Sequence, residues 1–117
     1  MDKSTRPKIK TTPTNQPAEF FQNEVLRPIL KQKHDLINTL FLHSLKKKGD
    51  GFSSRSHEEK ESILSSFFKT NQKDVAILKG VVIGQFSLEE YNLYLTDEAA
   101  INKRILSLMK QRISSTF

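Results

Sequence analysis

The chain of 117 residues contains no cysteine and no tryptophan. The lack of cysteine excludes disulfide bonds, thiolate zinc sites, iron–sulfur ligation and a cysteine nucleophile. No apolar run reaches the ~18 residues that a membrane-spanning helix needs, and the charged N-terminus has no hydrophobic signal-peptide segment. A chain of this length accommodates one small domain. We therefore expect a soluble cytoplasmic protein that does not span a membrane.

Acidic residues are outnumbered by basic ones, 13 against 19, which gives a net charge of +6. Half of this excess lies in the first ten residues, and residues 1–16 hold a single large aliphatic side chain, Ile9. Such a segment cannot bury enough apolar surface to offset the entropy of ordering. We predict a disordered basic tail over residues 1–16 and a single helical domain over residues 17–117. Nucleic-acid binding is expected to be limited to weak, salt-sensitive contacts of this tail.

One long helical pattern runs from residue 17 to residue 48. Pro28 lies inside it and lacks the backbone N–H that would bond to the carbonyl of Glu24. We therefore predict a kink at Pro28, or a short first helix followed by a second. The apolar stripe of this pattern consists of Val25, Leu26, Ile29, Leu30, Leu36, Ile37, Leu40 and Phe41.

Two serines are each followed three residues later by glutamate, as in a capping box: Ser56 with Glu59, and Ser87 with Glu90. A helix of about 14 residues is predicted after Ser56, and another helix after Ser87. A last helix is predicted from Thr96 to about residue 114, either separate from its predecessor or continuous with it.

Residues 75–86 are rich in β-branched side chains, which is typical of a buried strand, but the chain offers no second strand for pairing. We therefore predict a helix, apolar nearly all round, as the central buried element. Gly80 and Gly84 within it favour close helix packing, or a pocket beside the helix. The expected fold is all-α, an irregular bundle of four to five helices with a long first helix kinked at a proline.

Motifs for catalysis and metal binding are missing. The chain has no HExxH, no GxSxG and no complete phosphate-binding loop. His34 and His43 lie nine residues apart, on opposite sides of one helix, so they cannot share an ion. His57 and Glu61 could, but two ligands at an exposed helix start make a poor site. We expect no catalytic residue, no metal and no cofactor.

Polar residues on the apolar stripes are the most informative irregularity. Lys33 falls on the stripe of the long helix, and Glu98, Asn102 and Arg112 fall on that of the last helix. In a buried seam such residues need partners, and they can fix register or oligomeric state. Alternatively, the long side chains reach water at the stripe edges, and Pro28 turns Lys33 out of line. Asn102, with the shortest reach, is the strongest candidate for a seam contact.

Three stretches resemble a family of short, all-helical bacterial proteins of unknown function. They are residues 21–31 (FQNEVLRPILK), 84–91 (GQFSLEEY) and 102–104 (NKR), and the similarity spans roughly residues 17–113. Some members carry a glyoxalase-related label, but glyoxalases resemble one another through repeated βαβββ modules with metal ligands on strands, which this chain lacks. The resemblance implies a helical fold and a bacterial, cytosolic origin, and it assigns no residue a role.

The predicted function is that of a non-enzymatic helical protein acting through protein contacts, including a homodimer. The first stripe spans about 160° of helix surface, broader than the ~100° that a single-sided core helix shows, so a second copy is its simplest cover. The interface is expected on the long helix, the last helix or both, with Asn102 setting its register. The alternative is a small ligand-binding protein or enzyme in which Arg27 or Arg104 holds an anion between helices.

Overall fold

The computed structural model describes residues 17–46 and 51–117, and the regular secondary structure of these residues is all helical, with no strand. The predicted tail, residues 1–16, lies outside them. The predicted number of helices, four to five, is too low. The described chain forms six, if the contiguous segments from residue 17 to residue 32 count as one. The elements are α1 (Pro17–Phe21), the π-helical turn η1 (Gln22–Leu26), α2 (Arg27–Gln32), α3 (His34–Lys46), the 3-10 turn η2 (Phe52–Ser54), α4 (His57–Thr70), α5 (Gln72–Ile83), α6 (Leu88–Thr96) and α7 (Glu98–Thr116).

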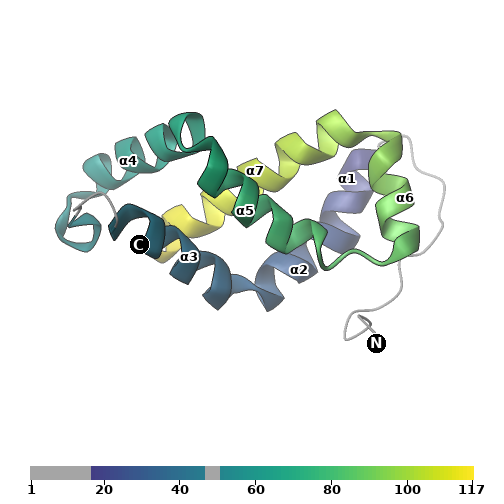
Figure 1. Ribbon diagram of the computed structural model, residues 1–117, viewed down its shortest axis with the longest axis horizontal. Helices are drawn as coiled ribbons and strands as arrows, with labels where there is room; N and C mark the ends of the chain where they lie inside the picture. Colours follow the sequence, from purple (N-terminus) through teal and green to yellow (C-terminus); the bar gives the residue numbers. More distant parts are fainter. Residues whose placement is uncertain (1–16, 47–50) are drawn as a thin grey trace.

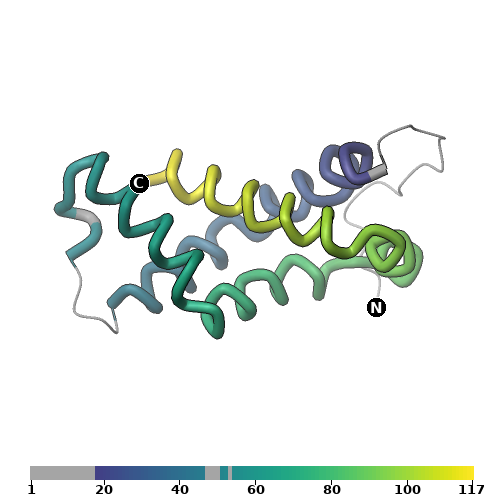
Figure 2. Tube along the Cα trace, turned by 90° about the horizontal axis from the view of Figure 1, so that it is seen from above, coloured from purple at the N-terminus to yellow at the C-terminus, as the bar shows by residue number. Residues whose placement is uncertain are grey.

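The centre of the molecule is α7, which runs along its long axis and contacts α1, η1, α4, α5 and α6 (Figures 1 and 2). Its apolar stripe is almost completely enclosed, since Ile105, Met109 and Ile113 have no exposed surface. The helix predicted for residues 75–86 is present as α5, but its predicted central position is wrong. Ile77 on its outer side is 49% exposed, because α5 packs on its neighbours with one face only.

The predicted interruption is slightly misplaced, because the backbone stays helical through Pro28 and a first helical segment is followed by a second only further along the chain. Just before the proline, η1 forms a wider turn in which the Arg27 N–H donates to the carbonyl of Gln22, five residues back. Such a π-turn shifts the hydrogen-bond register and accommodates a residue without a backbone N–H. The helix is interrupted instead at Lys33, whose backbone (φ −101°, ψ 14°) separates α2 from α3.

Aromatic rings fill the core towards both ends. On the side of α3 and α4, the ring of Phe41 meets those of Phe52 and Phe67 edge-on, with centroids 5.4 and 5.0 Å apart. On the side of α1 and α6, Phe21 meets Phe86 edge-on at 5.3 Å. Edge-to-face contacts of this kind add about 0.5–1.5 kcal/mol each beyond the burial of the rings.

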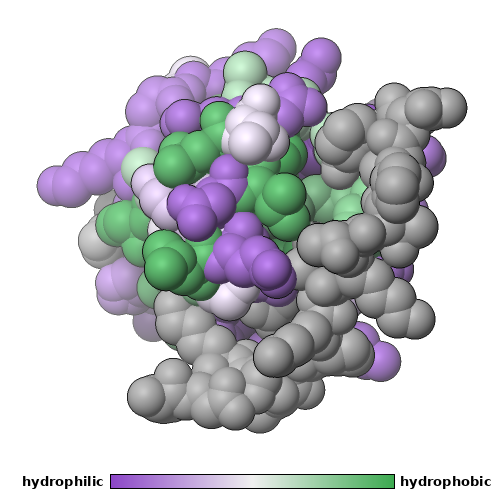
Figure 3. Space-filling view, turned by 90° about the vertical axis from the view of Figure 1, so that its right-hand side faces the viewer, coloured by the Kyte–Doolittle hydropathy of each residue, from purple (hydrophilic) through white to green (hydrophobic). Residues whose placement is uncertain are grey.

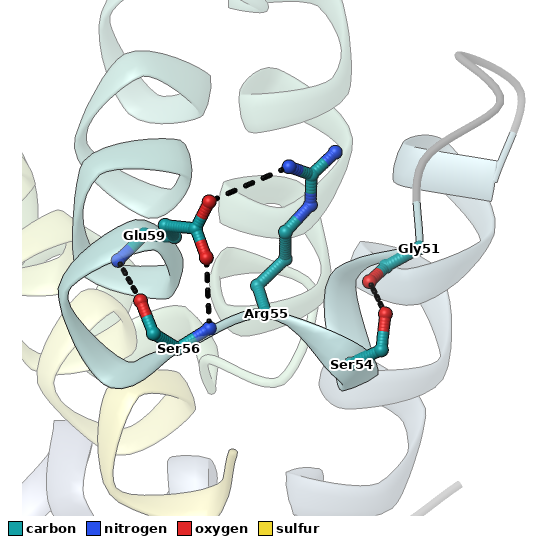
Figure 4. Close-up of polar contacts among 5 residues, drawn as sticks. All are labelled: Gly51, Ser54, Arg55, Ser56 and Glu59. Carbon is teal, nitrogen blue, oxygen red and sulfur yellow. Dashed lines mark hydrogen bonds and ion pairs between the residues drawn. The ribbon is translucent and has the colours of Figure 1, made fainter.

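Both predicted capping boxes are confirmed. At the start of α4 the Glu59 N–H donates to Ser56 Oγ over 3.2 Å, and the Ser56 N–H donates to the Glu59 carboxylate over 3.1 Å (Figure 4). Hydrogen bonds from Ser56, the backbone N–H first, lower the pKa of Glu59 below its ordinary 4.5. At the start of α6 the Ser87 N–H donates to Glu90 over 2.8 Å, and the Glu90 N–H donates back to Ser87 Oγ over 3.1 Å. The second box is the less exposed one, because Glu90 is buried.

The close helix packing predicted for the two glycines of α5 is wrong for Gly80, since a Cβ added there would meet no neighbouring atom within 4 Å. Gly84 instead ends the helix, and its N–H donates to the Gly80 carbonyl over 2.8 Å. Among the described helices, none combines the length and the apolar character that crossing a membrane requires.

Candidate functional site

A groove of about 720 Å³ lies between the first helical segment and the C-terminal part of α7. Its walls carry three cationic side chains, those of Arg27 and Lys31 on α2 and of Arg112 on α7. No carboxylate is among the described residues that line it. The groove is therefore positively charged, and its apolar lining consists of Pro28, Leu30 and Leu108.

The guanidinium of Arg27 is oriented by a neighbour one helical turn away. Its Nε donates to Asn23 Oδ1 over 3.1 Å, and both side chains are exposed. A single bond through Nε fixes the plane of the group and leaves its two terminal nitrogens available as a fork of donors. Arg27 can therefore present this fork to an anion in the groove.

Arg112, on the opposite wall, is oriented by His34 at the start of α3. Its Nη1 lies 3.2 Å from His34 Nδ1. A guanidinium can only donate hydrogen bonds, so Nδ1 accepts and the proton of the neutral ring is on Nε2.

The side-chain amide of Asn38 completes this chain of contacts, 3.1 Å from His34 Nε2. The amide atom nearest to this nitrogen is Nδ2, which is a donor, so a hydrogen bond to a protonated Nε2 requires the amide to be turned with Oδ1 towards the ring. Asn38 is 8% exposed, and its Oδ1 has no partner among the described residues. A buried, incompletely satisfied amide costs stability, which the contact with His34 partly offsets.

The structure brings together a different pair of arginines from the one the sequence suggested. Arg27 and Arg112 line the same groove, whereas Arg104 does not line it. The Nη1 of Arg104 donates instead to Gln22 Oε1 over 2.8 Å, joining α7 to η1. Arg104 therefore has a structural partner, and Arg112, predicted as a seam residue, takes its place in the groove.

The other three predicted seam residues, Asn102, Glu98 and Lys33, do not line the groove. Asn102 accepts a hydrogen bond from the Tyr94 hydroxyl over 2.6 Å, so its partner lies within the chain. Burial raises the pKa of Tyr94 above its ordinary 10.0. Glu98 is exposed at the start of α7, and Lys33 is half-buried at the break between α2 and α3.

Three residues of this region were missed from the sequence: Lys31, His34 and Asn38. The sequence did indicate that Lys31 lies near Arg27, because residues 23, 27 and 31 follow one another at intervals of four and so share a helix face. His34 and Asn38 have the same spacing, but the contact of His34 with Arg112 joins residues 78 apart, and no local pattern in the sequence indicates it.

A second surface feature is an apolar face on α6, at one end of the molecule, which we call the α6 face. Leu88 is 77% exposed, Tyr91 40% and Leu95 47%, and their spacing puts all three on one side of the helix. Figure 3 views this end, where apolar side chains gather with polar ones among them. A shallow hollow of about 340 Å³ adjoins Leu88 and Tyr91. The charged residues of α6 and the segments beside it in the sequence are all acidic, since no lysine or arginine lies between residues 79 and 103.

The described residues contain no group of three side chains suited to holding a metal ion. No protein-family model matches the chain, and no curated protein or solved structure is significantly similar to it. The resemblance to short bacterial helical proteins stays a prediction. The function has to be argued from the groove and the α6 face themselves.

Proposed function

We propose that this chain is a non-enzymatic helical protein that acts through protein–protein contacts, and that two copies pair through the α6 face. The observation that carries the proposal is the exposure of Leu88, Tyr91 and Leu95 on one side of a helix of nine residues. Complete burial of a leucine side chain is worth about 1.5–3 kcal/mol, so covering this face stabilises an association.

A second copy of the chain is the binding partner that we propose for the α6 face. In a two-fold dimer the same surface contributes twice, so a small self-complementary patch serves as both halves of the interface. An antiparallel pairing of the two α6 helices brings Leu88 opposite Leu95 of the second copy. α6 lies at one end of the molecule (Figure 1).

The proposed interface differs from the one expected from the sequence. The apolar stripe of α7 is covered by its own chain, and Asn102 already has Tyr94 as a partner. A register-setting role for Asn102 between copies therefore has no support, and α6 takes the place of α7. The proposal keeps a bacterial cytoplasm as the setting, supported by the lack of cysteine and by the family resemblance.

The test is the mass of the full chain in solution, measured by light scattering at micromolar concentration. The unaltered chain is expected at twice its 13.5 kDa. The double variant Leu88→Gln with Leu95→Gln is expected at 13.5 kDa with an unchanged helical circular dichroism spectrum. A matched control makes the same kind of change at two other exposed apolar positions, Leu36→Gln and Ile77→Gln, and should stay dimeric. A monomeric unaltered chain, or an α6 variant that still dimerises, would overturn the proposal.

A further inference from the structure

We infer that the groove between α2 and α7 is a binding site for a small organic anion, held by Arg27, Lys31 and Arg112. This site is separate from the α6 face and does not depend on dimerisation. Its ligand class follows from three observations: unpaired positive charge, side chains already oriented, and an apolar wall.

The first observation is the absence of counter-charges. Within the described part of the chain, none of the three cations forms an ion pair, although Arg55 does so with Glu59 over 3.6 Å. Three like charges along one groove repel one another, which raises the free energy of the empty site. An anion bound between them removes this repulsion and gains charge-assisted hydrogen bonds.

The second observation is the orientation of the two guanidinium groups. Asn23 fixes Arg27 through Nε, and His34 fixes Arg112 through Nη1, and neither partner is a carboxylate. Each group keeps further N–H donors for a ligand. On the wall of α7, the hydroxyls of Ser115 and Thr116 both donate to the Arg112 carbonyl, at 3.0 and 2.9 Å, so this acceptor is already occupied.

The third observation is the apolar part of the groove, formed by Pro28, Leu30 and Leu108. Its volume of about 720 Å³ suits a small molecule rather than an isolated ion. Planar guanidinium forks match the oxygens of phosphate and carboxylate groups. The ligand is therefore a multiply charged phosphate or carboxylate compound with a small apolar body that rests against the half-buried Pro28, since Leu30 and Leu108 are only 2% and 8% exposed.

The experiment titrates the full chain at low ionic strength and follows backbone amide and arginine Nε–H signals by NMR. Pyrophosphate and citrate separate phosphate from carboxylate chemistry, and phenyl phosphate compared with inorganic phosphate tests the apolar body. We expect saturable shifts on η1, α2 and the last turns of α7, and tighter binding of phenyl phosphate than of inorganic phosphate.

The variants Arg27→Gln and Arg112→Gln are each expected to weaken binding about tenfold or more. Arg104→Gln is the matched control, because it removes a guanidinium from α7 that lies outside the groove, and it should leave affinity unchanged. The α6 double variant should also bind normally, which separates this inference from the proposed dimer.

Three results would overturn the inference. The first is no saturable shift with any of the four probes at millimolar concentration. The second is an equal loss of affinity in Arg104→Gln, which indicates general attraction to a basic protein. The third is shifts caused by a polyglutamate peptide and by none of the small probes, which assigns the groove to an acidic protein segment.

Discussion

Two of the four polar residues on the apolar stripes of this protein, Asn102 and Arg112, have partners that lie within the chain. Asn102 accepts from Tyr94, and Arg112 contacts His34. The sequence identified both as irregular, because a polar group at helical spacing with apolar ones is visible without a structure. Their partners could not be predicted for one shared reason. A hydrogen bond between elements depends on how helices cross, and no local pattern encodes it.

The hydroxyl of Tyr94 tests this explanation directly. Tyr94→Phe removes the donor to Asn102 and is expected to lower the free energy of unfolding by about 1 kcal/mol. In a double-mutant cycle with Asn102→Ala, the coupling energy should be about 0.5–1.5 kcal/mol, measured by urea denaturation. Additive effects of the two substitutions would show that the pair contributes nothing.

The same tyrosine predicts a loss of stability in alkali. Its folded pKa is raised above 10.0 by burial, so folding favours the neutral phenol. This contribution is fully present below the unfolded pKa and is lost as pH rises through the folded pKa. Urea denaturation at pH 9 and pH 11 should therefore show a smaller alkaline loss in Tyr94→Phe than in the unaltered chain. An identical loss in both would assign the effect to other groups.

Gly80 is expected to be a stabilising site for alanine. It lies inside α5 with open space around its missing Cβ, so Gly80→Ala should raise the free energy of unfolding by about 1 kcal/mol. Gly84→Ala is the control, because an added Cβ there lies 3.0 Å from the Gly80 carbonyl oxygen and should gain less. Destabilisation by Gly80→Ala would mean that this glycine has a packing role after all.

At the scale of elements, the sequence predicted what depends on a few neighbouring residues. The two capping boxes close within four residues, so Ser56 and Ser87 mark helix starts without reference to the rest of the chain. The response of the helix to Pro28 could not be predicted in this way. A proline can kink a helix or be absorbed by a π-turn, and packing of Val25 and Leu26 against the core decides between these outcomes.

The two caps predict different losses of stability. Ser56→Ala is expected to cost about 1 kcal/mol and Ser87→Ala more, because the second box is partly buried and the substitution removes Ser87 Oγ, the acceptor for the Glu90 N–H. Ser62→Ala, an exposed change in the middle of α4, is the control and should not destabilise the protein. Thermal unfolding of the three variants gives the comparison, and equal losses at Ser87 and Ser62 would refute it.

The cap at Ser56 also predicts a response to acid. The folded pKa of Glu59 is lowered, so its contribution is present above the ordinary value of 4.5 and is lost as pH falls through the folded pKa. Between pH 5 and pH 2 the unaltered chain should therefore lose more stability than Glu59→Gln does. The same slope in both proteins would contradict the capping role of this carboxylate.

At the scale of the whole molecule, the all-helical class was predictable and the surfaces were not. Helical periodicity and the lack of a pairing strand were sufficient for the class. The groove, in contrast, joins Arg27 to Arg112 across 85 positions, and only the packing of the first helical segment beside α7 brings them together. The exposure of the apolar side chains of α6 could not be predicted either, because an amphipathic pattern does not show which apolar side chains are covered by another element.

Salt is expected to strengthen the proposed dimer. Every charged residue between positions 80 and 102 is acidic, so pairing two copies through α6 brings like charges closer. Raising the ionic strength from 0.05 to 0.5 M shortens the Debye length from more than 10 Å to about 4–5 Å and screens this repulsion. Sedimentation equilibrium should show a lower dissociation constant at high salt. A dimer weakened by salt would indicate attraction between opposite charges, and thus a different interface.

Disulfide trapping is the most direct test that two copies meet through α6. The chain has no cysteine, so Asn92→Cys introduces a single thiol beside Tyr91 in the middle of that helix. On mild oxidation at micromolar concentration, we predict rapid formation of a covalent dimer by Asn92→Cys, and little by Lys103→Cys, an exposed site on α7. Equal, slow cross-linking at both positions, or none at Asn92→Cys, would contradict the account.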